Sequence, residues 1–251
     1  MNKRPEPRTF QVLSAQQVTP NMRRVTIGGS AMAGFPPGQD GGYVKLMLPG
    51  EADKPSLRTY TIRRQTADTL DIDFALHGDA GSGGPAVAWS LSASAGDEIT
   101  AGGPGPAKPL PEGADWYFAM GDMTALPAIS VNLEALPADA KGDAVIEIQT
   151  EADRQDLAHP EGVTIHWVIN PEPGHHPELF EQAVRAIAWR PGRVYAWSAT
   201  EFEVMRRLRT YLRGERGLGP DQLYISSYWK QGLEEDKHRV VKRADAEEVS
   251  A

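Results

Sequence analysis

The sequence predicts two domains, an antiparallel β-barrel followed by a smaller α/β domain with a parallel sheet. Short segments rich in Val, Ile, Thr and Tyr, separated by Gly, Pro or Asp, fill about the first 105 residues, which is typical of a barrel or sandwich. The stretch 101–115 (AGGPGPAKPLPEGAD) is dense in Gly and Pro and indicates a boundary. Beyond it, apolar strands alternate with helical patterns, which predicts a parallel sheet with crossover helices. We therefore expect a barrel domain over 1–112 and an α/β domain over 113–251.

The predicted strands of the first domain are short and end at turn-forming residues. They are FQVLSAQQV (10–18), MRRVTIGG (22–29), GGYVKLMLP (41–49), RTYTIRR (58–64) and TLDIDFAL (69–76). A helix is expected over 83–99 (GGPAVAWSLSASAGDEI), because Pro85 stands near its first position and Gly96 past its end.

The second domain has the alternation of a parallel sheet. Its predicted strands are DWYFAMG (115–121), DAVIEIQT (143–150), GVTIHWVIN (162–170), GRVYAWSA (192–199) and DQLYISSYW (221–229). Its predicted helices are TALPAISVNLEAL (124–136), PELFEQAVRAIAW (177–189) and TEFEVMRRLRTYLRGERG (200–217). The chain after about Lys237 is charged, and we expect a mobile tail there.

The composition argues against several classes of partner. The chain has 251 residues and a formal charge of −8, so nucleic acid is not an expected partner. It contains no run of about 18 apolar residues, and the N-terminal MNKRPEPRTF lacks the apolar region of a signal peptide. We therefore expect a cytoplasmic protein without stable membrane association.

The residues that are missing also limit the chemistry. The chain has no cysteine, which excludes disulfides, thiolate nucleophiles and cysteine-held clusters. No metal site is expected at His175 and His176 or at His159 and His166, because no further ligand stands at a suitable spacing. There is no G-x-S-x-G motif for a hydrolase. If the protein transfers electrons, an organic cofactor has to carry them.

The segment KPSLRTYTIRRQ (54–65) is unusually polar for a half-buried strand. The face that begins at Arg58 holds a cation, then Tyr60, then Ile62. A guanidinium matches a phosphate, and a tyrosine ring offers a surface for stacking, so this face suits a flat, anionic ligand. The hydroxyl of Thr61 would reach such a ligand only if the strand ends or twists there, because strict alternation puts it on the opposite face. A solvated strand face is the alternative interpretation.

Two strand-to-helix turns are further candidates for binding. In LHGDAGSGGPAVAW (76–89) a Gly-rich loop leads into a helix, whose free N–H groups and dipole favour an anion. In MGDMTALPAI (120–129) Gly121 and Asp122 follow a strand, and a helix opens near Thr124. Ligands of open parallel sheets bind at such carboxyl ends, and a nicotinamide cofactor would lie there. A flexible hairpin and a plain turn are the respective alternatives.

Taken in order, these segments resemble the siderophore-interacting proteins, flavin-dependent ferric-siderophore reductases of the ferredoxin–NADP reductase superfamily. The resemblance covers most of the chain, from about Arg8 to Asp236. It rests on the order and spacing of VKLMLP (44–49), RTYT (58–61), DFALHG (73–78), GPAVAW (84–89), GDEI with GGPGP (96–106), GDMTALPAI (121–129), WSATE (197–201), RRLRTYL (206–212) and SYWKQGLEED (227–236).

The resemblance implies an FAD held between the barrel and the second domain. Within Arg58–Thr59–Tyr60–Thr61, Arg58 would meet the phosphate side of the flavin, Tyr60 would stack on its ring, and Thr61 would bond its reactive edge. The resemblance also gives binding roles to residues elsewhere in the chain. These are Gly84, Pro85 and Ala86 at the pyrophosphate, His77 nearby, and Gly121, Asp122 and Thr124 on the nicotinamide side.

The implied activity is reduction of a ferric siderophore. Electrons would pass from NAD(P)H through FAD to chelated Fe(III), and iron would leave as Fe(II), which hard oxygen donors bind less tightly. Lys45 and Lys230 match positions where the family gathers cations for an anionic ferric chelate. Met123 and Thr200 depart from the residues usual in the family, so ferredoxin stays open as the donor. The alternatives are a general NAD(P)H–flavin reductase that feeds a partner protein, and a non-catalytic protein that binds flavin or chelate.

Overall fold

The computed structural model describes residues 6–50, 54–76, 84–233 and 235–250. Contacts between Cα atoms divide the chain into two compact units. The first unit is Met1–Pro109 with Ser130–Asn132, and the second is Leu110–Ile129 with Leu133–Ala251. The change from one unit to the other thus falls inside the Gly- and Pro-rich stretch, and one turn of a later helix is assigned to the first unit.

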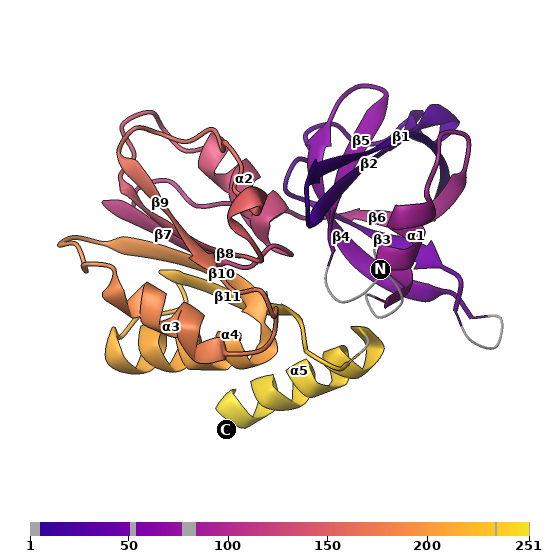
Figure 1. The fold of residues 1–251 in the computed structure, drawn as a ribbon. Helices are drawn as coiled ribbons and strands as arrows, with labels where there is room; N and C mark the ends of the chain where they lie inside the picture. The colour runs from indigo at the N-terminus through magenta and orange to yellow at the C-terminus, as the bar shows by residue number, and fades with distance from the viewer. Residues whose placement is uncertain (1–5, 51–53, 77–83, 234, 251) are drawn as a thin grey trace. The chain divides into compact units, whose positions relative to one another are not determined.

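The first unit is a closed antiparallel barrel whose described strands pair in the order β1-β2-β5-β4-β3-β6 (Figure 1). The strands are β1 (Arg8–Thr19), β2 (Met22–Gly28), β3 (Tyr43–Leu48), β4 (Ser56–Gln65), β5 (Thr69–Ala75) and β6 (Glu98–Gly105). A short 3-10 helix, η1 (Gly29–Met32), follows β2, and α1 (Gly84–Ser92) lies between β5 and β6 in the chain. Helix α1 packs against β2, β3 and β5.

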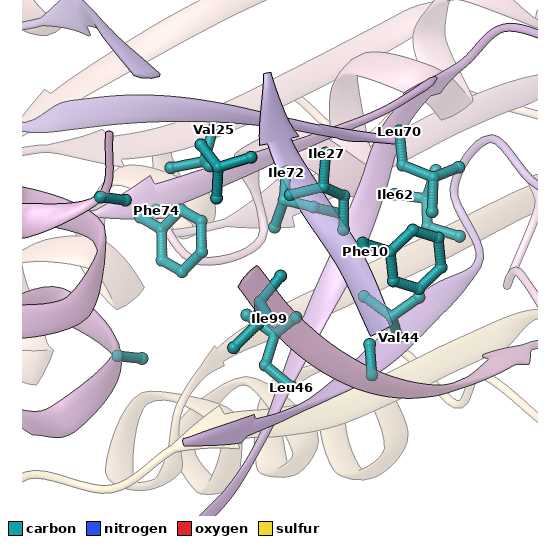
Figure 2. Packing of buried hydrophobic residues seen from close by; sticks show 14 of the residues in the cluster. Phe10, Val25, Ile27, Val44, Leu46, Ile62, Leu70, Ile72, Phe74 and Ile99 are labelled. Carbon is teal, nitrogen blue, oxygen red and sulfur yellow. The ribbon is translucent and has the colours of Figure 1, made fainter. Parts of the chain in front are cut away.

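Alternation along the strands builds the barrel core. In β3, for example, Val44 and Leu46 are 1% exposed, whereas Tyr43 and Lys45 are half-buried on the other face. Inward-facing side chains of the barrel strands meet in one cluster (Figure 2). Those labelled there are Phe10, Val25, Ile27, Val44, Leu46, Ile62, Leu70, Ile72, Phe74 and Ile99. Burial of this apolar surface is the main force that closes the barrel.

The second unit contains a parallel sheet in the order β11-β10-β7-β8-β9 (Figure 1). The strands are β7 (Trp116–Gly121), β8 (Gly142–Ile148), β9 (Val163–Ile169), β10 (Val194–Glu201) and β11 (Leu223–Trp229). Every residue of β7 and β8 is buried, as expected of central parallel strands covered on both faces. The strand order reverses between β7 and β10, which is where ligands of such sheets bind.

The helices of the second unit are α2 (Leu126–Glu134), α3 (Pro177–Ala186), α4 (Phe202–Arg209) and α5 (Glu235–Ser250). Side chains from alternate positions of β7, β8 and β10 pack with α3 and α4 in one apolar cluster. On the opposite face α2 approaches β7, where a Cβ on Gly121 would lie only 2.6 Å from Ile129 Cδ1. None of the helices within the described ranges is long and apolar enough to cross a membrane.

The fold class predicted from the sequence is confirmed, and three local predictions are wrong. The helix predicted over 83–99 ends at Ser92, because Glu98 and Ile99 belong to β6, which pairs with both β1 and β3. The helix predicted over 200–217 is divided into α4 and a π-helical segment, η3 (Thr210–Glu215). The chain after Lys237 is not an unstructured tail, because it belongs to α5, which packs against β11.

Candidate functional site

The pairing of β3 with β4 decides which way the polar residues of β4 face. Residues directly opposite each other in an antiparallel pair project to the same side. Tyr60 lies opposite the buried Val44, and Arg58 lies opposite the buried Leu46, so both are on the core-facing side of β4. Thr61 continues the alternation onto the other face, because the register shift in β4 comes only after Ile62. The sequence prediction that Arg58 and Tyr60 share a face is therefore confirmed, and Thr61 does not share it.

Tyr60 is the first ring in a row of aromatic side chains. Its ring centroid lies 4.3 Å from that of Phe74 on β5, and Phe74 lies 5.7 Å from Trp89 on α1. Phe74 is fully buried, whereas Tyr60 is half-buried and packs at the margin of the core. The row thus fixes one side of the Tyr60 ring and links β4 to the helix that follows the Gly-rich loop.

Helix α1 begins in the way that the sequence predicts. Gly84 has φ +76°, a left-handed conformation that suits glycine, and among the described residues beyond its chain neighbours and its own helix no heavy atom lies within 4 Å of a Cβ built on it. Pro85 follows, Ala86 is buried, and the first turn carries no acidic side chain to offset the helix dipole. The Arg23 Nε donates to the carbonyl of Ser90 at 2.7 Å, which ties α1 to β2. His77 lies outside the described residues.

Lys45 lies on the outer face of β3. It pairs across to Thr59 on β4 and to Gly102 on β6, and a Cβ on Gly102 would have no neighbour within 4 Å among the described residues other than those adjacent in the chain. Thr59, Thr61 and Lys45 therefore share one face of the barrel wall. The sequence named all three residues, but only strand pairing brings them together.

In the second unit, Asp122 connects three segments at the carboxyl edge of the sheet. The Oδ1 atom accepts hydrogen bonds from the backbone N–H and the hydroxyl of Thr124, at 2.9 and 2.6 Å. The Oδ2 atom accepts from the backbone N–H of Glu201 at 2.8 Å and from the indole of Trp229 at 2.9 Å. Burial raises the pKa of Asp122, while these hydrogen bonds act to lower it. Gly121 precedes it at the point where the strand order reverses.

Glu201 has a similar role on the neighbouring strand. Its carboxylate accepts from the backbone N–H groups of Glu203 and Val204 and so caps the N-terminus of α4. Its other oxygen accepts from the backbone N–H of Gln231 at 3.1 Å. Thr200, one of the two departures from the family pattern, is buried and donates to the Glu201 carbonyl at 3.1 Å. The carboxylates of Asp122 and Glu201 therefore already accept hydrogen bonds from backbone N–H groups that could otherwise donate to a phosphate.

Glu147 is a third buried carboxyl at this edge, on β8. The Asn170 side chain donates to it at 3.2 Å. Burial, together with the nearby carboxylates of Asp122 and Glu201, raises the pKa of Glu147 to about 8. Glu147 is therefore largely protonated at neutral pH, which lowers the negative charge of the group.

Replacement of Glu147 by glutamine should change how stability depends on pH. Because the folded pKa is raised, the folded state holds more protons between about pH 4.5 and 8, and the wild type loses stability as pH rises through this window. Glu147→Gln has no ionisable group at this position. Between pH 5 and pH 9 its free energy of unfolding should therefore rise, relative to that of the wild type, by on the order of a few kcal/mol. Urea unfolding of both proteins at the two pH values measures this gain. An equal pH dependence in the two proteins would contradict it.

Lys230 lies in a tight turn directly after β11. Its ammonium is 2.7 Å from a Glu203 carboxylate oxygen and 4.4 Å from the centroid of the Phe202 ring. The backbone N–H of Leu233 donates to the Lys230 carbonyl at 3.0 Å, and Gly232 in the turn has φ +74°. The Lys230 side chain is 22% exposed, so it is held in place but still reaches solvent. Lys45 and Lys230 belong to different units.

Sequence reasoning missed Glu147, Trp229 and the full role of Glu201. A glutamate inside the otherwise apolar run AVIEI (144–148) was the available signal for Glu147. No sequence signal marks Trp229, because its hydrogen bond to Asp122 joins residues 107 positions apart.

Met123, the second residue that departs from the family pattern, is buried, and its sulfur accepts a hydrogen bond from Gln149 Nε2 at 3.6 Å. Among the described residues, no group of three or more His, Asp or Glu side chains is placed to hold a metal ion.

Comparison with protein families covers both units. The model of the siderophore-interacting protein family matches residues 114–232. The model of the siderophore-interacting FAD-binding domain matches residues 11–57 and 49–108. The second match contains the aromatic row, Gly84 and Lys45, so these features belong to an FAD-binding domain.

Individual relatives match along nearly the whole chain. Ferric vibriobactin reductase ViuB of Vibrio cholerae is 33% identical over 254 residues, which cover 92% of each chain. The NADPH-dependent ferric-chelate reductase of Escherichia coli is 25% identical over 244 residues, 88% of this chain and 92% of the relative. The crystal structure of the siderophore-interacting protein SipS from Aeromonas hydrophila superposes with a TM-score of 0.84 at 31% identity, covering 96% of this chain and 98% of SipS. The chain therefore belongs to the siderophore-interacting protein family, whose members carry an FAD-binding domain.

Proposed function

We propose that this protein is an FAD-dependent oxidoreductase that reduces Fe(III) held by a siderophore, so that iron is released as Fe(II). The observation that carries the proposal is the match over 92% of the chain to a ferric vibriobactin reductase, which extends across both the barrel and the sheet. When bound, FAD supplies the redox chemistry, accepting electrons from a donor and passing them to chelated iron. The protein supplies binding, position and charge.

The barrel offers residues that fit an FAD. Tyr60, held from behind by Phe74, presents a half-buried ring for the isoalloxazine. Arg58 is on the same face and provides a guanidinium for the phosphates. The N-terminus of α1 at Gly84, Pro85 and Ala86 favours the pyrophosphate through its dipole. The roles of Thr59, Thr61 and His77 stay predictions, and Thr61 faces away from Tyr60.

The electron donor is proposed to be a nicotinamide nucleotide at the carboxyl edge of the sheet. Gly121, Asp122 and Thr124 lie there, and the Escherichia coli relative is by name NADPH-dependent. Because the carboxylates of Asp122 and Glu201 already accept from the local N–H groups, nucleotide phosphates would have to bind elsewhere. Reduced ferredoxin is the alternative donor, and separate reduction assays with NADPH, NADH and ferredoxin distinguish the three.

The chelate is proposed to bind at the two cations Lys45 and Lys230. Replacing either by methionine should raise KM for an anionic ferric chelate about fivefold, since one partly exposed charge contact contributes about 1 kcal/mol. The rate of reduction by the donor should not change. The effect should shrink at high salt, because ions screen exposed charges.

Steady-state kinetics with a ferric catecholate test this proposal, with Lys141→Met as the matched control. Lys141 is an exposed lysine directly before β8, and its loss should leave KM unchanged. If all three variants retain the wild-type KM, the chelate does not bind at Lys45 or Lys230.

A further inference from the structure

Hydrogen bonds hold helix α5 against strand β11. His238 is 5% exposed, and its Nε2 lies 2.9 Å from the hydroxyl of Ser227. One turn later, Lys242 donates to the Ser226 hydroxyl at 2.6 Å and to the Ser227 carbonyl at 2.8 Å. The imidazole is therefore fixed in position by strand β11 rather than free on a helix surface.

A third contact holds the far end of the helix. The Asp245 carboxylate accepts two hydrogen bonds from Arg209 of α4, at 2.5 and 2.8 Å, and also lies 3.4 Å from Arg206. Bidentate contacts of this kind restrict the relative orientation of the two side chains as well as the distance between them. Helix α5 thus has a defined position against both β11 and α4.

The Phe202 ring connects His238 to Lys230. Phe202 is 3% exposed, and the His238 ring meets it edge-on, with the centroids 6.2 Å apart and the planes at 85°. The Lys230 ammonium lies 4.4 Å from the centroid of the same ring. A cation near an aromatic ring is attracted to its face, so the orientation of the ring determines where the ammonium is most stable.

We propose that His238 is a positioning residue for Lys230, acting through the Phe202 ring, so that α5 sets the affinity of the protein for its anionic ferric chelate. The inference rests on the role proposed above for Lys230. His238 touches neither chelate nor flavin in this proposal. Its side chain fixes the orientation of the Phe202 ring, which contacts the Lys230 ammonium. The Glu203 carboxylate forms the second contact of that ammonium.

Protonation of His238 should make the docking of α5 depend on pH. Burial, then the positive charges of Lys242 and Lys230, lower the pKa of His238 to about 4. Ser227 and Phe202, which also face it, are uncharged. A histidine released from this place would titrate near 6.5. The docked state therefore binds fewer protons between about pH 4 and 6.5, and docking of α5 is strongest above pH 6.5 and weakens as pH falls through that window.

The test measures KM for a ferric catecholate in the full chain with three variants. His238→Ala should raise KM about three- to fivefold at pH 7.5, at most the effect of Lys230→Met, while kcat and reduction by the donor stay unchanged. His238→Phe keeps a ring edge for Phe202 and should retain a KM within about twofold of wild type. Arg243→Ala, on the exposed side of α5 with a side chain 83% exposed, is the matched control and should change nothing.

The pH profile separates positioning from a merely structural role. In the wild type KM should rise as pH falls from 6.5 to 4.5, and this rise should be absent from His238→Phe, which cannot take up the proton. The same rise in both proteins would overturn the inference. So would an unchanged KM in His238→Ala combined with a raised KM in Lys230→Met. An unchanged KM in Lys230→Met would instead remove the proposed role of Lys230, and this inference with it.

Discussion

Replacing Tyr60 by leucine is expected to weaken FAD binding roughly 5- to 150-fold, because the loss of an aromatic side chain on which a flat heterocycle stacks costs about 1–3 kcal/mol. Leucine keeps an apolar contact with Phe74, so the barrel should remain folded. Tyr60→Phe retains the ring and should bind FAD within about twofold of wild type. Titration of the flavin-free protein with FAD, followed by quenching of flavin fluorescence, gives Kd for each variant. Equal Kd values for the leucine and phenylalanine variants would show that FAD does not stack on Tyr60.

Replacing Asp122 by alanine should lower the free energy of unfolding of the second unit by about 3–5 kcal/mol. The buried carboxylate accepts from Thr124, Glu201 and Trp229, and its removal leaves their N–H groups without this acceptor. Because these bonds join the ends of β7, β10 and β11, the change should also slow electron transfer from the donor.

Equilibrium urea unfolding followed by tryptophan fluorescence measures the stability of this variant. Asp139→Ala removes an exposed carboxylate of the same unit and serves as the control, with an expected change below about 0.5 kcal/mol. If Asp122→Ala were as stable as Asp139→Ala, the hydrogen bonds to Asp122 would not hold the carboxyl edge together.

The sequence was sufficient to predict the fold class, because both signals are local. Alternation of buried and exposed residues is visible in segments such as 43–48, and continuous apolar runs are visible in segments such as 116–120. Strand β6 escaped prediction because its first residues, Glu98 and Ile99, lie within the helix predicted over 83–99, and GGPG, at its end, lacks the β-branched residues by which strands are recognised. Helix α5 escaped because its contacts to Ser226, Ser227 and Arg209 are polar, so its sequence resembles a solvated tail.

The candidate site was predictable only where its residues are close in sequence. Arg58 and Tyr60 share a face by simple alternation, and Gly121, Asp122 and Thr124 stand within four positions. Two rows of side chains join distant segments and depend on strand pairing and helix packing. One runs from Tyr60 through Phe74 to Trp89, and the other from Lys230 through Phe202 to His238. No spacing in the sequence encodes them, because tertiary contacts and not periodicity bring these side chains together.

In the proposed reaction the protein takes electrons from a donor onto bound FAD and delivers them to a ferric siderophore. We would record the absorbance spectrum of the purified protein under nitrogen, add NADPH, NADH or reduced ferredoxin, and then add a ferric catecholate. The flavin bands should bleach with a donor and return when the ferric chelate is added, as Fe(II) appears. Flavin bands that none of the donors bleaches would indicate a binding protein without turnover. A colourless protein that cannot be reconstituted with FAD would contradict the proposed function.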